Sequence, residues 1–293
     1  MEHICIKNPS NTIMKTCIHT VIKNEPDEYL TPWLEHHCPM VDHIYIFEDI
    51  GSHSHKHITD RYENVTLLSV LDMYDNQAGK DRLIENDKKG KMNQRYFIMD
   101  GVTYIQKLNL YDWCFTLDID EFITLQEPYK TIPDVLSEFL DKDAVILQWI
   151  NFGASGRIYK PQYNGRDYRE FYTQRAEFSK ADEKFKMDSK ICWNLRRITR
   201  WNLTGLHCCA GNWCKTDGKK DRRSTVYDKM YLKHYITKSF EEYIWKVYVR
   251  GMHTRGAHRK MDDFFEINQD MLPMREKLEE IKNNIINVYN NGT

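Results

Sequence analysis

Three carboxylates stand close together in residues 111–123, YDWCFTLDIDEFI. Residues 113–117 have the short apolar pattern of a buried strand, and Asp118, Asp120 and Glu121 follow it directly. Carboxylates beside a buried strand end are costly unless a positive group lies among them. The hard cations Mg²⁺ and Mn²⁺ prefer oxygen ligands and bridge phosphates well. The stretch therefore predicts a metal-bound diphosphate, and with it nucleotide chemistry.

The same acidic residues also have a purely structural explanation. Acidic side chains often follow strands as helix N-caps, and the Asp-x-Asp spacing arises by chance in many proteins. Residues 118–121 alone do not separate the two explanations, so the elements that position them have to decide.

A second group of potential metal ligands consists of His207, Cys208, Cys209 and Cys214. Their spacing lacks the paired Cys-x-x-Cys pattern of structural zinc sites, so we expect no zinc there. The chain has 8 cysteines and shows no secretory signal, which indicates reduced thiols rather than disulfides.

Composition excludes some classes of protein. The 42 Lys and Arg residues nearly balance the 43 Asp and Glu residues, so the basic excess typical of nucleic-acid binding is missing. We find no apolar signal region at the start and no run near the roughly 20 apolar residues of a membrane span. We therefore expect a cytoplasmic protein without a membrane span. The 18 Tyr, 12 Phe and 7 Trp residues suit sugar or base faces as well as a core.

Strands and helices alternate through the first half of the chain. This alternation predicts an α/β fold, with a mostly parallel central sheet flanked by helices. A polar loop is expected at 71–91. The expected strands are 16–22, 43–47, 65–70, 113–117 and 144–150, and the expected helices are about 27–38, 92–109 and 133–140.

Polar residues follow three of these strands directly. Asn24 and Glu25 come after the first strand, Asp49 after the second, and Asp118 and Asp120 after the strand at 113–117. Ligands of such sheets bind outside the carboxyl ends of the strands. We therefore expect these side chains to line one crevice.

The second half of the chain is less regular. A strand pair is expected around 190–201, followed by a strand at 231–235 and a helix at 238–251. That helix begins with a capping-box pattern, Ser239 followed by Glu242. The last 35 residues have a helical pattern.

Several motifs follow one another in an order that resembles a known family. They include LDIDEFI at 117–123, QWINFGASG at 148–156 and HYITKSFEE at 234–242, with Lys and Arg-Gly beyond. This order is similar to that of the glycosyltransferases of the family 92 and family 2-like group, over about residues 16–251. The resemblance implies a GT-A (Rossmann-like) fold with an irregular C-terminal acceptor-side region. It also implies a nucleotide-sugar donor and a divalent metal, usually Mn²⁺.

The resemblance assigns donor contacts to particular residues. Asn24 and Glu25 match the donor-binding loop, and Asp49 matches the acidic residue that faces the base or ribose. Lys190 and Lys238 match basic positions that meet the diphosphate.

The resemblance also implies a metal site. Asp120 matches the direct ligand, Asp118 its partner, and His234 a third contact to the metal or the diphosphate. A metal held there would stabilise the nucleoside-diphosphate leaving group electrostatically. One departure is Arg157, where relatives often have His after the WxxFGxSG motif.

Inverting transfer, which only the resemblance implies, needs a general base near the acceptor hydroxyl. Glu170, Glu177 and Asp182 lie between the acceptor loop and the late motifs. Glu177, in the expected strand RAEF, is the first choice, and all three remain open.

We therefore expect a metal-dependent hexosyltransferase that moves a sugar from a UDP-sugar to a glycan or other hydroxyl acceptor, as in polysaccharide biosynthesis. The expected cofactor is Mn²⁺ or Mg²⁺. One domain is expected over 1–293, with a nucleotide-sugar-binding half (1–150), an acceptor-side half (151–260) and a helical tail (261–293). The alternatives are a nucleotidyltransferase, although residues 20–28 lack the glycines of a phosphate loop, and a degenerate sugar- or nucleotide-binding module.

Overall fold

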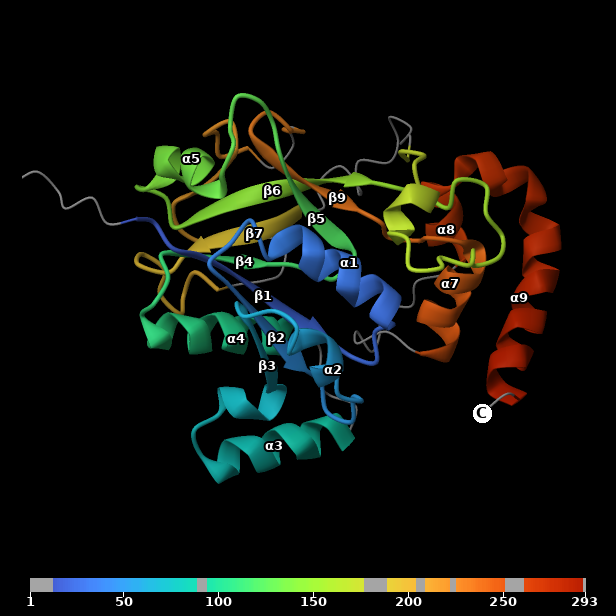
Figure 1. Cartoon of the computed structure of the whole chain (residues 1–293), viewed down its shortest axis with the longest axis horizontal. Helices are drawn as coiled ribbons and strands as arrows, with labels where there is room; N and C mark the ends of the chain where they lie inside the picture. Colours follow the sequence, from blue (N-terminus) through green and yellow to red (C-terminus); the bar gives the residue numbers. More distant parts are fainter. Residues whose placement is uncertain are drawn as a thin grey trace, which may run out of the picture.

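One mixed sheet organises the described part of the chain. Nine strands form it, with neighbours in the order β3-β2-β1-β4-β7-β6-β9-β5 and with β8 beside β6. Helices flank the sheet, as Figure 1 shows for α1 and α4. The expected α/β class is confirmed. The computed structural model describes residues 13–88, 94–176, 189–203, 209–221, 225–250 and 261–291.

Four parallel strands make up the first part of the sheet. They are β1 (Thr16–Ile22), β2 (His43–Glu48), β3 (Val65–Ser69) and β4 (Trp113–Thr116). Every residue of β1 is buried, because α1 (Asp27–His37) packs on one face and α4 (Gln94–Leu108) on the other. Burial on both faces extends even to the polar residues of β1, which are Thr16, His19 and Thr20.

The remaining strands extend the sheet beyond β4. The antiparallel strand β7 (Ser189–Asn194) lies between β4 and β6 (Ala144–Asn151). Two strands run parallel to β6, namely β8 (Trp213–Lys215) and β9 (Met230–His234). The strand β5 (Glu121–Leu125) pairs antiparallel with β9. The carboxyl ends of β1, β4, β6 and β9 therefore point to the same edge.

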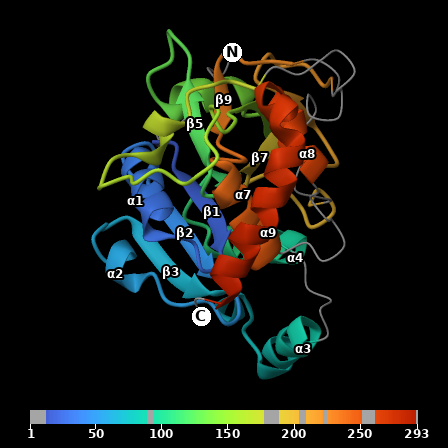
Figure 2. The ribbon, with the colours of Figure 1, turned by 90° about the vertical axis from the view of Figure 1, so that its right-hand side faces the viewer.

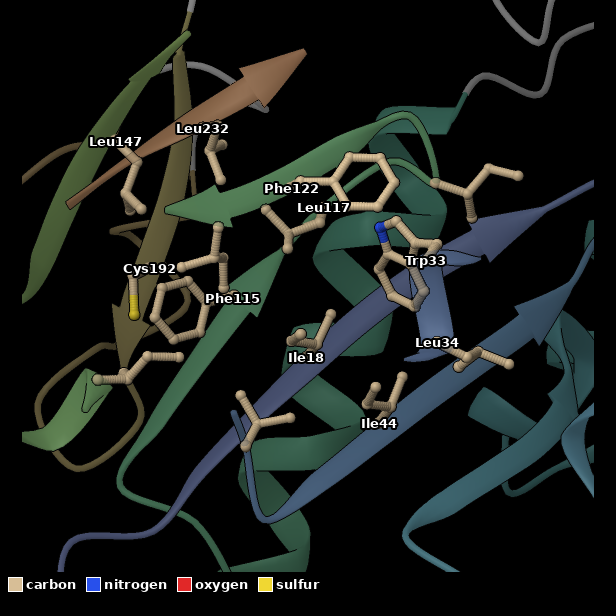
Figure 3. Close-up of a cluster of buried hydrophobic side chains, with 14 of the residues drawn as sticks. Ile18, Trp33, Leu34, Ile44, Phe115, Leu117, Phe122, Leu147, Cys192 and Leu232 are labelled. Carbon is tan, nitrogen blue, oxygen red and sulfur yellow. The ribbon is translucent and has the colours of Figure 1, made fainter. Parts of the chain in front are cut away.

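The core on the α1 side joins both parts of the sheet. Ile18 of β1, Trp33 of α1 and Leu147 of β6 belong to one buried cluster. Figure 3 shows Trp33 lying beside Phe122 of β5. The Trp33 Nε1 also donates a hydrogen bond of 2.9 Å to the Glu121 carbonyl oxygen. The core thereby fixes the backbone where β5 begins.

The C-terminal helices form a second cluster beside the sheet edge. It includes Phe240 and Tyr243 of α7 (Phe240–Ile244), Phe264 of α8 (Met261–Ile267) and Leu278 of α9 (Arg275–Asn291). Figure 2 shows α9 running alongside α7, which follows β9 in the chain. A π-helical turn, Trp245–Val249, continues α7. Along the ranges described above, none of the helices is both long and apolar enough to cross a bilayer.

The remaining helices and helical turns complete the described structure. All of them except α3 have six residues or fewer. They are α2 (Lys56–Thr59), η1 (Val70–Met73), α3 (Gln77–Lys88), α5 (Ile132–Leu136), η2 (Ser137–Phe139), η3 (Tyr168–Phe171) and η5 (Gln269–Met274).

Three sequence expectations about elements are wrong. The stretch 71–91 was expected as a loop but contains α3, a helix in which only Leu83 is buried, so no apolar periodicity announces it. The strand β5 was not expected, because its five residues directly follow the acidic turn. In place of a strand pair at 190–201, the chain turns after β7, where the amides of Arg197 and Ile198 both donate to the Asn194 carbonyl oxygen at 3.0 Å.

Candidate active site

The acidic motif forms a tight turn between β4 and β5. The Glu121 amide donates to the Asp118 carbonyl oxygen at 3.1 Å, and the Asp118 amide donates to Glu121 Oε2 at 2.9 Å. Leu117 and Ile119 are buried in the core, which anchors the turn from below. The turn therefore holds the Asp118 and Asp120 carboxylates at the carboxyl edge of the sheet, where the sequence predicted them.

Lys190 neutralises the first carboxylate of the motif. It lies within β7, and its Nζ is 2.7 Å from Asp118 Oδ2 and 3.6 Å from Glu121 Oε1. Burial disfavours the Lys190 ammonium, but Asp118 and Glu121 outweigh it and raise its pKa. Burial likewise disfavours the Asp118 carboxylate, but Lys190 outweighs this effect and lowers its pKa. The two groups thus form a charged pair.

Glu121 behaves differently from its neighbour. Its side chain is fully buried, and burial raises its pKa well above the usual value despite the opposing effect of Lys190. Asp118 and Asp120 raise the Glu121 pKa further. Glu121 therefore favours its neutral form and serves to shape the turn.

Asp120 faces three basic groups. Its Oδ2 lies 2.7 Å from Lys246 Nζ and 4.0 Å from Lys238 Nζ, and its Oδ1 lies 3.6 Å from His234 Nε2. Burial opposes ionisation, but Lys246 and His234 outweigh it, so the Asp120 pKa is well below its usual value. Asp120 is therefore a buried, ionised group at the centre of a positive cluster.

His234 is held in place by its second ring nitrogen. Its Nδ1 lies 2.9 Å from Asn151 Oδ1, and Trp149 packs on the ring with centroids 4.2 Å apart. Its Nε2 lies on the side of Asp120, and a hydrogen bond between these two side chains helps to lower the Asp120 pKa. Asn151 and Trp149 thus fix which face of the imidazole meets Asp120.

The proposed metal ligands fit a divalent cation in the kind of donor they offer. Two carboxylates and an imidazole suit Mn²⁺, and Asn151 orients the imidazole as a metal site requires. In the described ranges, however, no three or more His, Cys, Asp or Glu side chains are arranged to hold a metal ion. Lysine ammonium groups lie against Asp118 and Asp120 instead.

Lys238 is also part of the positive cluster. Its backbone is in the left-handed region, with φ of 53°, and its ammonium lies over the rings of Tyr29 and Tyr168 at 4.5 and 5.2 Å. Burial lowers the Lys238 pKa to about 8, although Asp120 opposes this shift. The aromatic surroundings direct the ammonium toward Asp120.

The residues that the resemblance matched to donor contacts include Asn24, Glu25 and Asp49, which lie at the ends of β1 and β2. Asn24 has φ of 50°, and its Oδ1 accepts a hydrogen bond of 2.8 Å from the His53 amide. Asp49 forms an ion pair of 3.0 Å with Lys23, and Glu25 pairs with Arg250. Asn24 thus ties the two loops together, and Glu25 ties the first loop to the C-terminal helices.

One of the three candidate general bases lies within the described residues. Glu170 lies in η3, is half exposed, and pairs with Arg166, which precedes η3. Glu177 and Asp182 lie outside the described residues. Arg157, the departure from the family motif, donates a hydrogen bond of 3.0 Å to the Phe171 carbonyl oxygen.

The cysteine-rich segment is described only in part. Cys209 and Cys214 are buried, whereas His207 and Cys208 lie outside the described residues. Burial raises the pKa of the Cys214 thiol to about 11.

Sequence reasoning gave no role to Lys246 and Arg250. Both belong to the basic positions after the HYITKSFEE motif, four residues apart on one helical segment. That spacing, which places side chains on one helix face, is the signal that would have identified them. No protein-family model matches this chain, and comparison with curated proteins gave no match.

Proposed function

We propose that this chain is a metal-dependent glycosyltransferase that moves a hexose from a UDP-sugar to a hydroxyl of a glycan or similar acceptor, with inversion at the anomeric carbon. The observation that carries the proposal is the Asp118–Asp120 turn at the carboxyl edge of the parallel strands, opposite His234 and three lysines. Carboxylates and ammonium groups at one sheet edge suit a metal-bound diphosphate.

The residues of the site have separate tasks in such a reaction. Asp120, Asp118 and His234 would hold Mn²⁺ or Mg²⁺, which supplies electrostatic stabilisation of the leaving diphosphate. Lys190 keeps Asp118 ionised and oriented. Lys238 places a fixed positive charge beside the site, and such a preorganised charge stabilises developing negative charge without reorganisation.

The end of β1 bears on the nucleotidyltransferase alternative. Residues Lys23 to Pro26 connect β1 to α1 without a glycine, and Asn24 takes the left-handed conformation. A glycine-rich loop that cradles phosphates through backbone amides is therefore lacking in this connection. This favours sugar transfer over nucleotidyl transfer.

Binding of UDP with Mn²⁺ tests the proposal. We expect the pair to raise the melting temperature of the wild type, because a ligand that binds only the folded state stabilises it. Asp120→Ala should abolish the shift. Asp141→Ala, which removes an exposed carboxylate paired with Lys142, is the matched control and should retain it. A wild type that no nucleoside diphosphate stabilises would rule the proposal out.

Product analysis separates the alternatives. Sugar transfer releases UDP from a UDP-sugar, whereas nucleotidyl transfer releases pyrophosphate. Tight UDP binding without turnover over a range of sugars and acceptors would support a binding module instead.

A further inference from the structure

Two basic side chains of one helical segment reach the strand ends. Lys246 lies in the π-helical turn after α7, and Arg250 follows that turn, with its amide donating to the Trp245 carbonyl oxygen at 2.9 Å. Lys246 contacts Asp120, and Arg250 contacts Glu25. Asp120 follows β4 and Glu25 follows β1, and these strands are neighbours in the sheet. The segment thus places two cations across the carboxyl ends of β1 and β4.

The cations there lie beside carboxylates in a poorly solvated place. Lys238 and Lys246 lie near Asp120, Arg250 pairs with Glu25, and Glu242 also raises the pKa of Lys238 electrostatically. The side chains of Asp120, Glu25, Lys238, Lys246 and Arg250 are at least three-quarters buried, with Lys246 the most exposed at 22%. Charges attract more strongly in such surroundings than in water, so the oxygens of a bound phosphate would compete well with the carboxylates for these cations.

Lys246 also lies where it would compete with a metal ion for Asp120. Its Nζ lies 2.7 Å from Asp120 Oδ2, an oxygen that a divalent cation bound by Asp120 would share. An ammonium and a metal ion therefore compete for the same carboxylate. A diphosphate that attracts the Lys246 ammonium would remove this competition.

We propose that Lys246 and Arg250 are a diphosphate clamp that exchanges partners when the donor binds. Without donor, they neutralise Asp120 and Glu25. With donor, they bind its phosphate oxygens, and Asp120 becomes available to the metal. The inference rests on the proposed function and assigns the donor diphosphate to these two side chains. It makes metal and diphosphate binding mutually dependent, because coupling between two ligands is reciprocal.

Lys246→Met tests the clamp because the two ligands respond in opposite directions. The affinity for UDP in the presence of Mn²⁺ should fall about tenfold or more, as expected for loss of a hydrogen bond to a charged group. The affinity for Mn²⁺ alone should rise, because the competing ammonium is gone. Titration calorimetry measures the affinity for UDP, and electron paramagnetic resonance of free Mn²⁺ measures the affinity for Mn²⁺.

Two further variants serve as controls. Arg250→Met should weaken UDP binding without tightening Mn²⁺ binding, because Arg250 pairs with Glu25 and not with Asp120. Lys142→Met removes a lysine of similar exposure, 23%, that pairs with surface Asp141, and should change neither affinity. If Lys246→Met does not fold, Lys246→Gln is measured in its place.

The outcomes distinguish a failure of the proposed function from a failure of the clamp. Wild-type protein that binds no UDP with Mn²⁺ would overturn the proposed function and the clamp with it. Wild-type protein that binds UDP, with Lys246 variants that keep its affinity or do not tighten Mn²⁺ binding, would overturn the clamp alone. Opposite shifts of the two affinities would establish it.

Discussion

Two buried glutamates, Glu121 and Glu242, differ in how their carboxyl groups are satisfied. Glu121 has Lys190 at 3.6 Å, and its Oε1 accepts no hydrogen bond from the described residues. Glu242 accepts five hydrogen bonds, from the hydroxyls of Tyr29, Tyr163 and Tyr172 and from the amide and hydroxyl of Ser239. The Glu121 carboxyl group has few partners and favours its neutral form, whereas the Glu242 carboxylate is saturated by neutral donors.

The tyrosines around Glu242 remain donors at all ordinary pH values. Burial, and next the Glu242 carboxylate, raise the pKa of Tyr163 and of Tyr29 above the usual range. The hydroxyls come from α1, from the segment before η3 and from the residue after η3. Glu242 therefore joins α1, α7 and the segment 163–172 into one framework.

This difference distinguishes a carboxylate that holds helices together from carboxylates that can exchange their charged partners. A carboxylate saturated by hydroxyl and amide donors cannot change partners without leaving several buried polar groups unpaired, which costs about 1–3 kcal/mol each. A carboxylate paired with a lysine exchanges that lysine for another cation more easily. We infer that Glu242 holds the surrounding framework together, whereas Asp118 and Asp120 can exchange their lysine partners.

Glu242→Gln should have the largest effect on stability. The amide nitrogen of Gln cannot accept a hydrogen bond, so at least one buried tyrosine or serine hydroxyl loses its acceptor. We expect unfolding free energy to fall by about 2–3 kcal/mol, measured by urea denaturation. Glu241→Gln, one residue earlier and less buried, is the control. A loss below about 0.5 kcal/mol would show that the cluster contributes little to the framework.

Tyr172→Phe should have an intermediate effect. The Tyr172 hydroxyl donates to Glu242 Oε2 and lies 3.0 Å from the Tyr163 hydroxyl. Removing it deletes one of five donors and leaves the carboxylate otherwise satisfied, so we expect a loss of about 1–2 kcal/mol. In the double variant with Tyr163→Phe, the loss of unfolding free energy should differ from the sum of the two single losses, because both hydroxyls donate to Glu242. Strict additivity in denaturation experiments would argue against one connected cluster.

Glu121→Gln should have the smallest effect. Burial favours the neutral form of Glu121, and the Gln amide oxygen still accepts the Asp118 amide hydrogen bond that Oε2 accepts now. We expect a change of about 1 kcal/mol or less in unfolding free energy. A loss as large as that of Glu242→Gln would remove the distinction between the two glutamates, because Glu121 would then act as a required charge.

The two regions also differ in how well sequence predicts them. The Ser239–Glu242 capping box is confirmed, because its hydrogen bonds are local: the Glu242 amide donates to Ser239 Oγ at 3.2 Å, and the Ser239 amide donates to Glu242 Oε2 at 3.0 Å. The three tyrosine partners of Glu242 were not predicted, because they lie 70 to 213 residues away in the chain. At the acidic turn, likewise, the sequence predicted the local position of the carboxylates but not which distant lysine pairs with each.

By itself, the sequence determined the α/β class and the placement of Asp118 and Asp120 at the carboxyl edge of the sheet. Both follow from local physics, namely apolar runs that bury as strands and polar residues that end them. Only the tertiary structure decided which cation meets which carboxylate. Lys190 reaches Asp118 across 72 residues because the antiparallel strand β7 lies between β4 and β6. Lys246 reaches Asp120 across 126 residues, because α7 follows β9 at the same sheet edge.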